Sequence, residues 1–145
     1  MSRFCNVVVK REDSGGMFTI WAGPGAPNET IGAHTEPPSD PPQTEGLIIY
    51  TYNSKDVFRF CDSNADYKCD VGLAIQFDNE RANYIWFNNP WIGQPWIKVN
   101  GRDKDYLARD SFIDITANYC HFLIRRNQDS ENNIEFEVLI KQVTP

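Results

Sequence analysis

Residues 134–140 read Ile-Glu-Phe-Glu-Val-Leu-Ile, a stretch in which apolar side chains recur at every second position. Successive side chains of a β-strand point to opposite faces of a sheet, so this alternation predicts a strand with one buried and one mostly solvated face. A helix would instead place apolar residues three and four positions apart. We therefore expect a β-strand over residues 134–143, within an antiparallel sheet.

Similar short stretches, bounded by turn residues, recur along the chain. They predict strands at residues 4–10, 17–21, 47–52, 57–60, 71–77, 82–87, 96–99, 112–117, 119–126 and 134–143. Asp13-Ser14-Gly15-Gly16 predicts a hairpin turn between the first two strands, and Asn53-Ser54-Lys55 predicts a turn that returns the chain into the fourth. Residues 103–110 are the one stretch that fits a short helix or an irregular turn.

Residues 22–46 are rich in Pro, Gly, Thr and Glu and predict a long exposed loop, because Pro cannot donate to a strand ladder. A length of 145 residues fits one domain with a sizeable core. Many short strands without a fixed repeat favour a sandwich over a trefoil. The expected fold is all-β: a single-domain antiparallel β-sandwich over residues 1–145, with 22–46 as an exposed Pro/Gly-rich loop.

The chain carries a net charge of −6 at pH 7. Because an acidic surface repels phosphate backbones, we expect no nucleic-acid partner. No apolar run approaches the roughly 20 residues of a membrane span, and residues 1–6 lack the apolar segment of a signal peptide. We expect a cytoplasmic protein, an unconventionally secreted one, or a mature form.

The four cysteines are Cys5, Cys61, Cys69 and Cys120. Without a secretion signal, free thiols are the default. Cys61 and Cys69 bracket a polar loop and could be bridged, and the sequence does not choose between pairings. Cys120 lies in an apolar strand and is expected in the core. Because no CxxC pair or histidine cluster occurs, a zinc site is not expected.

The stretch Asp62-Ser63-Asn64-Ala65-Asp66 has the spacing of a calcium loop. The EF-hand pattern is incomplete, however, because Tyr67 stands where glycine is needed and Leu73 where glutamate is needed. We therefore favour an Asx-rich surface loop and expect no bound metal.

Catalytic motifs are absent from the sequence. His121 follows Cys120 directly, and neighbours in a strand point to opposite faces, so the two cannot form a dyad. There is no Gly-x-Ser-x-Gly motif, phosphate-binding Gly loop or dinucleotide fingerprint. We expect no enzymatic activity and no cofactor. Arg125, Arg126 and Lys141 form a candidate basic spot for a phosphate group, although solvated strand edges explain them more simply.

Three of the four tryptophans fall within residues 84–96, which also hold two prolines and a glycine. Because Pro and Gly stop a strand, we expect these aromatics on a stiff loop at a strand end, where they cannot all turn inward. Tryptophan there offers apolar area and an N–H donor at little entropic cost. The alternative is that some rings close the end of a β-core. The candidate ligand-binding residues are Tyr84, Trp86, Phe87, Asn88, Asn89, Pro90, Trp91 and Trp96.

With residues 72–79 (Gly-Leu-Ala-Ile-Gln-Phe-Asp-Asn) before it, this segment resembles the aegerolysins, small acidic β-sandwich proteins of fungi and some bacteria. That family has a Gly-x-x-x-Phe-Asp-like strand and then Tyr-Trp-Asp-x-Pro-Trp-Gly. The resemblance covers residues 47–142. The chain departs from the family at Asn88, where Asp is usual, and at Ile92, which is inserted before Gly93.

The resemblance implies a non-enzymatic protein that binds membrane lipid of the sphingolipid type. It also implies a larger pore-forming partner protein, which would make the chain the targeting component of a two-part cytolysin used as a toxin or in defence. Carried over by position, Trp86, Phe87, Pro90 and Trp91 would meet the bilayer interface, and Trp96 would support them or join them.

A small cytosolic fungal-type lectin is the main alternative function. Sugar rings stack on tryptophan, and the amides of Asn88, Asn89, Gln94 and Asn100 would bind sugar hydroxyl groups beside Trp91 and Trp96. A third possibility is a protein-binding module that uses the loop 22–46 as its contact. An exposed aromatic patch would equally suit a homo-oligomer contact.

Overall fold

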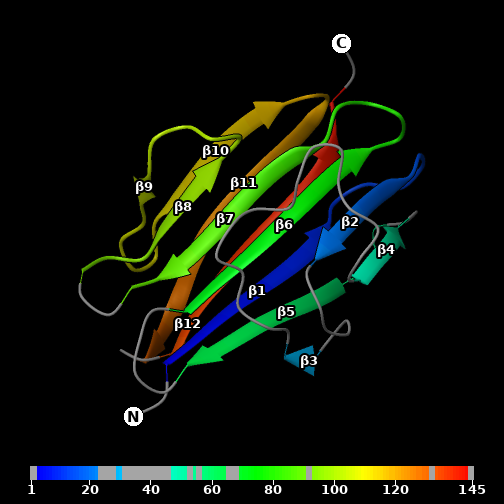
Figure 1. Ribbon diagram of the computed structural model, residues 1–145. Coiled ribbons are helices and arrows are strands. Elements are labelled where there is room, and N and C mark those ends of the chain that lie inside the picture. Colours follow the sequence, from blue (N-terminus) through cyan, green and yellow to red (C-terminus); the bar gives the residue numbers. More distant parts are fainter. Residues whose placement is uncertain are drawn as a thin grey trace.

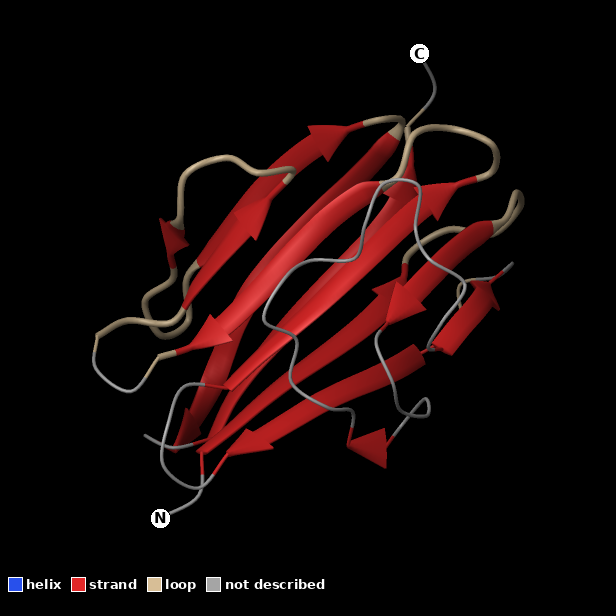
Figure 2. Cartoon of the chain, in the orientation of Figure 1, coloured by secondary structure: helices blue, strands red, loops and turns tan. Residues whose placement is uncertain are grey.

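The protein is a β-sandwich of two six-stranded sheets in this computed structural model. The structure describes residues 3–22, 29–30, 47–51, 54, 57–64, 69–90, 93–130 and 133–143. These residues form twelve strands and no helix (Figure 2). The strands of both sheets run along nearly the same diagonal in Figure 1. The expected all-β sandwich is confirmed.

The first sheet has the strand order β10-β11-β12-β1-β5-β3. Its strands are β1 (Arg3–Arg11), β3 (Glu29–Thr30), β5 (Val57–Asn64), β10 (Phe112–Ala117), β11 (Cys120–Ser130) and β12 (Asn133–Gln142). β12 pairs antiparallel with β11 but parallel with β1, and β3 is parallel to β5. Alternation in residues 134–140 specified which side chains are buried, but it carries no information on strand direction.

The second sheet has the order β4-β2-β6-β7-β8-β9, and the pairings among these strands are all antiparallel. Its strands are β2 (Phe18–Ala22), β4 (Leu47–Thr51), β6 (Cys69–Phe77), β7 (Asn83–Asn89), β8 (Trp96–Val99) and β9 (Asp105–Tyr106). The stretch 103–110 is irregular, which is one of its two expected conformations, except for the two-residue strand β9. It adds a short edge strand beside β8 and so extends the sheet surface that the tryptophans share.

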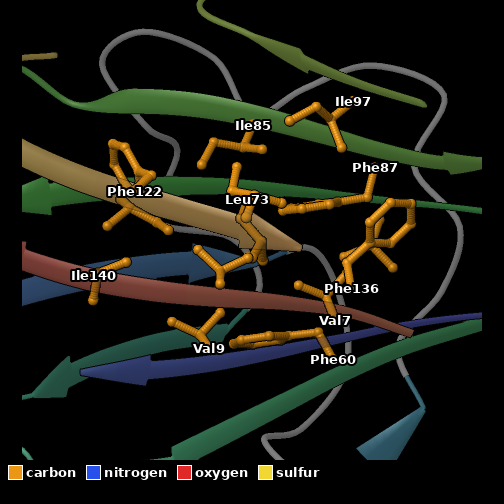
Figure 3. Close-up of a cluster of buried hydrophobic side chains, with 14 of the residues drawn as sticks. Val7, Val9, Phe60, Leu73, Ile85, Phe87, Ile97, Phe122, Phe136 and Ile140 are labelled. Atoms are coloured by element: carbon orange, nitrogen blue, oxygen red, sulfur yellow. The ribbon is translucent and has the colours of Figure 1, made fainter. Parts of the chain in front are cut away.

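Inward-facing side chains of both sheets form one hydrophobic core, and Figure 3 shows them pointing toward one another from the two layers. The rings of Phe87 in β7 and Phe136 in β12 have their centroids 5.3 Å apart, which joins the sheets directly. Cys120 is fully buried in this core, as expected. Burial raises the pKa of its thiol to about 12, because the charged thiolate would lose its hydration there.

The hairpin expected between the first two strands is not formed, because β1 lies in the first sheet and β2 in the second. The buried guanidinium of Arg11 supports this crossing. It donates hydrogen bonds to the carbonyls of Gly15, of Gly16 at 3.0 Å and of Thr51 at 2.7 Å. The prediction was wrong because a Gly-Gly turn specifies a change of direction and not the sheet that the next strand joins.

β4 and β5 also lie in different sheets, so the return expected after residues 53–55 is not a hairpin either. Within the stretch 22–46, which was expected to hold no ladder, Glu29 and Thr30 pair with β5. Residues 23–28 and 31–46 lie outside the described residues, so the rest of the predicted loop remains a prediction. Among the described residues, no helix is long and apolar enough to cross a membrane.

Candidate functional site

Strand β7 divides the candidate ligand-binding residues between two faces of the second sheet. Phe87 is fully buried in the core, and alternation places the buried Asn89 on the same side. Tyr84, Trp86 and Asn88 therefore lie on the outer face, away from the core. Phe87 is a core residue, so the expectation that its ring meets a bilayer is not compatible with its position. The strand extends to Asn89 because β6 pairs with it that far.

The end of the aromatic stretch is only partly described. Pro90 follows β7 directly and is partly buried. Trp91 and Ile92 lie outside the described residues, so the prediction that Trp91 contacts a ligand stays a prediction. The described residues continue from Gly93, whose φ of +101° suits glycine and turns the chain toward β8.

One row of side chains crosses the outer face of β7, β8 and β9. Asn88 lies directly opposite Trp96, and Trp96 lies directly opposite Tyr106. Side chains paired in this way project to the same side of a sheet. We call this row the outer row. Solvent exposure increases along it from Asn88, which has no exposed surface, through the partly buried Trp96, to Tyr106, which is 63% exposed.

A second row lies beside the first, where Trp86 stands between Gly72 of β6 and Lys98 of β8. Trp86 is only 6% exposed, yet it is not part of the core between the sheets. Because Gly72 has no side chain, nothing from that position of β6 shields the indole. Trp86, Asn88 and Trp96 thus form one aromatic and polar surface.

Within the part of the chain that the structure describes, three buried polar atoms on this face have no hydrogen-bond partner: Nε1 of Trp86, and Oδ1 and Nδ2 of Asn88. Leaving such a group unsatisfied costs about 1–3 kcal/mol. Asn83, in the same strand and equally buried, shows the usual arrangement. It donates to the Ala117 carbonyl at 3.1 Å and accepts from the amides of two further asparagines, Asn100 at 2.9 Å and Asn118 at 3.0 Å.

Two lysines bring positive charge to this surface of an acidic chain. The Nζ of Lys104 lies 4.6 Å from the centre of the Trp96 ring, which is a cation–π contact. Lys98 is paired with Trp86. A ligand that stacks on Trp96 therefore meets an ammonium group close to the ring.

The sequence analysis missed Lys98, Lys104 and Tyr106. Lys98 is two positions from Trp96 in a predicted strand, so the period of two could have placed both on one face. Tyr106 was hidden because residues 103–110 were not expected to form a strand. Asn100, named for the lectin alternative, instead closes the turn after β8, where its side chain bonds the backbone N–H of Tyr84 at 2.8 Å.

Other predicted candidates lie outside the outer row. In the calcium-like stretch, Asp62 and Asn64 lie in β5, and Asp66 is outside the described residues. Cys61 and Cys69 lie in β5 and β6, and their side chains are outside the described part of the chain. Lys141 is paired with His121 and not with Arg125, which is paired with Glu137 further along β11. The candidate basic spot therefore does not include Lys141.

No protein-family model matches the chain, and no curated protein matches it either. The functional proposal consequently rests on the chemistry of the outer row and its neighbours.

Proposed function

We propose that this protein is a non-enzymatic carbohydrate-binding protein of the lectin type. A sugar ring lies on Trp96 and Tyr106 and directs hydroxyl groups toward Asn88, whose amide has no exposed surface in the free protein and becomes accessible when the ligand binds. The observation that carries the proposal is the fully buried, unpartnered amide of Asn88 at the closed end of an aromatic row.

The chemistry of a sugar complements both parts of the row. One face of a pyranose ring exposes C–H groups that pack on aromatic rings, and its hydroxyl groups both donate and accept hydrogen bonds. The Asn88 amide offers one acceptor and one donor group, and Trp86 adds an N–H donor. A purely apolar ligand would leave these atoms unsatisfied, at a cost in binding free energy.

A glycan array tests the proposal directly. We expect binding to a subset of glycans that the corresponding free sugar competes away. Replacing the aromatic platform (Trp96→Ala) should weaken binding by roughly tenfold, since it removes a large stacking surface. Tyr50→Ala is the matched control, because Tyr50 is 56% exposed on β4 at the opposite edge of the same sheet. An array without hits, or equal losses in both variants, would contradict the proposal.

Membrane-lipid binding is the second candidate, supported by the aegerolysin-like pattern of residues 84–91 and by Trp91 directly after Pro90. Under this candidate, a larger pore-forming partner protein would assemble on the bound chain. Vesicles containing sphingomyelin and sterol should shift the tryptophan emission to the blue, and Trp91→Ala should abolish that shift while Trp96→Ala leaves it. The sugar proposal predicts the reverse sensitivity for glycan binding.

A further inference from the structure

A hollow of about 260 Å³ opens at the edge of the first sheet, where β10 begins. It is lined by Asp110, Phe112, Arg125, Arg126 and Asn127. None of these residues belongs to the outer row. We infer that this hollow is a second ligand site, which takes a small ligand with one ring and one oxyanion group such as a phosphate. The inference does not rest on the sugar proposal.

Hydrogen bonds to backbone groups hold Arg126 in a fixed position. The N–H of Arg126 donates to the carbonyl of Ser111 and its carbonyl accepts from the N–H of Asp110, both at 3.1 Å. Its Nη1 also donates to the carbonyl of Leu107 at 3.1 Å, which ties β11 to the segment after β9. Arg126 is paired with the buried Phe136, so its side chain lies on the core side of β11, where it fixes the wall of the hollow and leaves the ligand contact to Arg125.

Arg125 retains charge for a ligand. Its Nε lies 3.8 Å from Oε1 of Glu137, which is a loose ion pair, and its side chain is 46% exposed. Glu137 pairs more closely with Lys10, whose Nζ lies 2.9 Å from Oε2. Because Glu137 is shared with Lys10, it neutralises Arg125 incompletely. A guanidinium is well suited to oxyanions, which it binds through parallel N–H donors.

Phe112 supplies the apolar part of the site. It is the residue directly opposite Arg125 in the β10–β11 pairing, and 63% of it is exposed. A ring that packs on Phe112 would place an attached oxyanion next to the Arg125 guanidinium. One ligand that contacts both side chains would thus explain why the exposed Phe112 lies beside the cationic Arg125.

Charge and size restrict the ligand further. Arg125 brings positive charge to the face that it shares with Phe112, in a chain of net charge −6. Asp110 would accept a hydrogen bond from a hydroxyl or protonated phosphate oxygen. Pockets for drug-sized ligands measure roughly 300–1,000 Å³, so a smaller hollow favours a ligand with a single ring.

Nuclear magnetic resonance titrations with three probes test the inference. Phenyl phosphate carries the ring and the anion, inorganic phosphate only the anion, and phenol only the ring. We expect phenyl phosphate to shift the backbone amides of residues 110–112 and 125–127 saturably, and to bind more tightly than either fragment. Absence of saturable shifts there with phenyl phosphate would overturn the inference.

Variants separate this site from general electrostatic attraction. Arg125→Gln should weaken phenyl phosphate on the order of tenfold, since it removes a charge-assisted hydrogen bond. Phe112→Ala should lower phenyl phosphate affinity to that of inorganic phosphate. Lys141→Gln is the matched control, because it removes one exposed charge from the same sheet away from the hollow. Equal losses in Arg125→Gln and Lys141→Gln would refute a defined site.

Discussion

Asn88 and Trp96 are direct cross-strand partners on the outer face of the second sheet, and the fully buried member of the pair is the polar one. The amide of Asn88 makes no hydrogen bond, whereas that of Asn83, at the other end of the same strand, is fully engaged. Groups retained at a cost in stability are frequent in binding sites, because function opposes the most stable choice of residue.

Replacing Asn88 by leucine should therefore stabilise the protein. Asn88→Leu removes two unsatisfied polar atoms at similar volume, and we expect the free energy of unfolding to rise by about 1–3 kcal/mol in urea denaturation. Glycan binding should be lost in the same variant. Asn83→Leu is the control and should destabilise, because it breaks the contacts with Ala117, Asn100 and Asn118. If both variants destabilise equally, Asn88 has a structural role.

Substitutions of Phe87 in β7 should change the stability of the fold without changing ligand binding. Phe87→Ala removes a fully buried ring from the core, and we expect the free energy of unfolding to fall by about 3–5 kcal/mol. Phe87→Leu should lower the free energy of unfolding by less than Phe87→Ala does, and it should leave glycan affinity unchanged. A change in ligand affinity without loss of stability would show that Phe87 contacts the ligand after all.

Arg11 should be needed for the crossing between the sheets. Arg11→Met leaves the carbonyls of Gly16 and Thr51 without their donor and separates Asp13 from its ion pair at 3.0 Å. We expect a loss on the order of 3 kcal/mol in unfolding free energy. Arg11→Lys keeps the charge but holds its three donors on a single nitrogen, which cannot reach all the partners that the planar guanidinium bonds, so it should lie between the wild type and Arg11→Met. If Arg11→Met leaves the free energy of unfolding unchanged, Arg11 does not stabilise the crossing between the sheets.

The buried thiol of Cys120 should make stability fall at high pH. Its pKa is raised by burial from 9.0 to about 12, so the folded state keeps the proton that the unfolded state releases. Stability from this group is complete below pH 9 and is lost as the pH rises toward about 12. The slope approaches about 1.4 kcal/mol per pH unit.

Comparison with Cys120→Ala isolates that contribution, because all other ionisable groups are the same in the two proteins. The difference in unfolding free energy between the wild type and this variant should shrink from pH 9 upward. Native Cys120 should also resist alkylation at pH 8, as judged by mass spectrometry of the labelled peptide. Rapid labelling without unfolding would contradict a raised pKa.

Sequence periodicity was sufficient for ten of the twelve described strands, but not for the two-residue strands β3 and β9 or for the assembly of the sheets. Residues 96–99 and 112–117 were predicted with the bounds that the structure has, because turn residues flank clear apolar alternation. The segments after β1 and β4 were misjudged because local turn chemistry is the same whether a strand returns to its own sheet or crosses to the other. Pairing partners depend on long-range packing that no local pattern contains.

The candidate site was predictable in part for the same reason. Alternation requires Trp86 and Phe87 to point to opposite faces, but it does not say which of them faces the core. The contact between Phe87 and Phe136 decides this, and it joins residues far apart in the sequence. Tyr106 belongs to the site only because it pairs with Trp96. A strand of two residues is too short to show a periodic pattern in the sequence, so this pairing could not be predicted.

The position of β1 between β12 and β5 has a consequence for the order of folding. During synthesis, β5 becomes available to β1 early, but the opposite edge of β1 must wait until residues 133–142 have been made. Pairing between such distant segments is slow, because loop closure costs entropy before contacts form. An unpaired edge during that interval favours aggregation. We expect recombinant yield to depend on translation speed and on chaperones that shield the unpaired edge of β1.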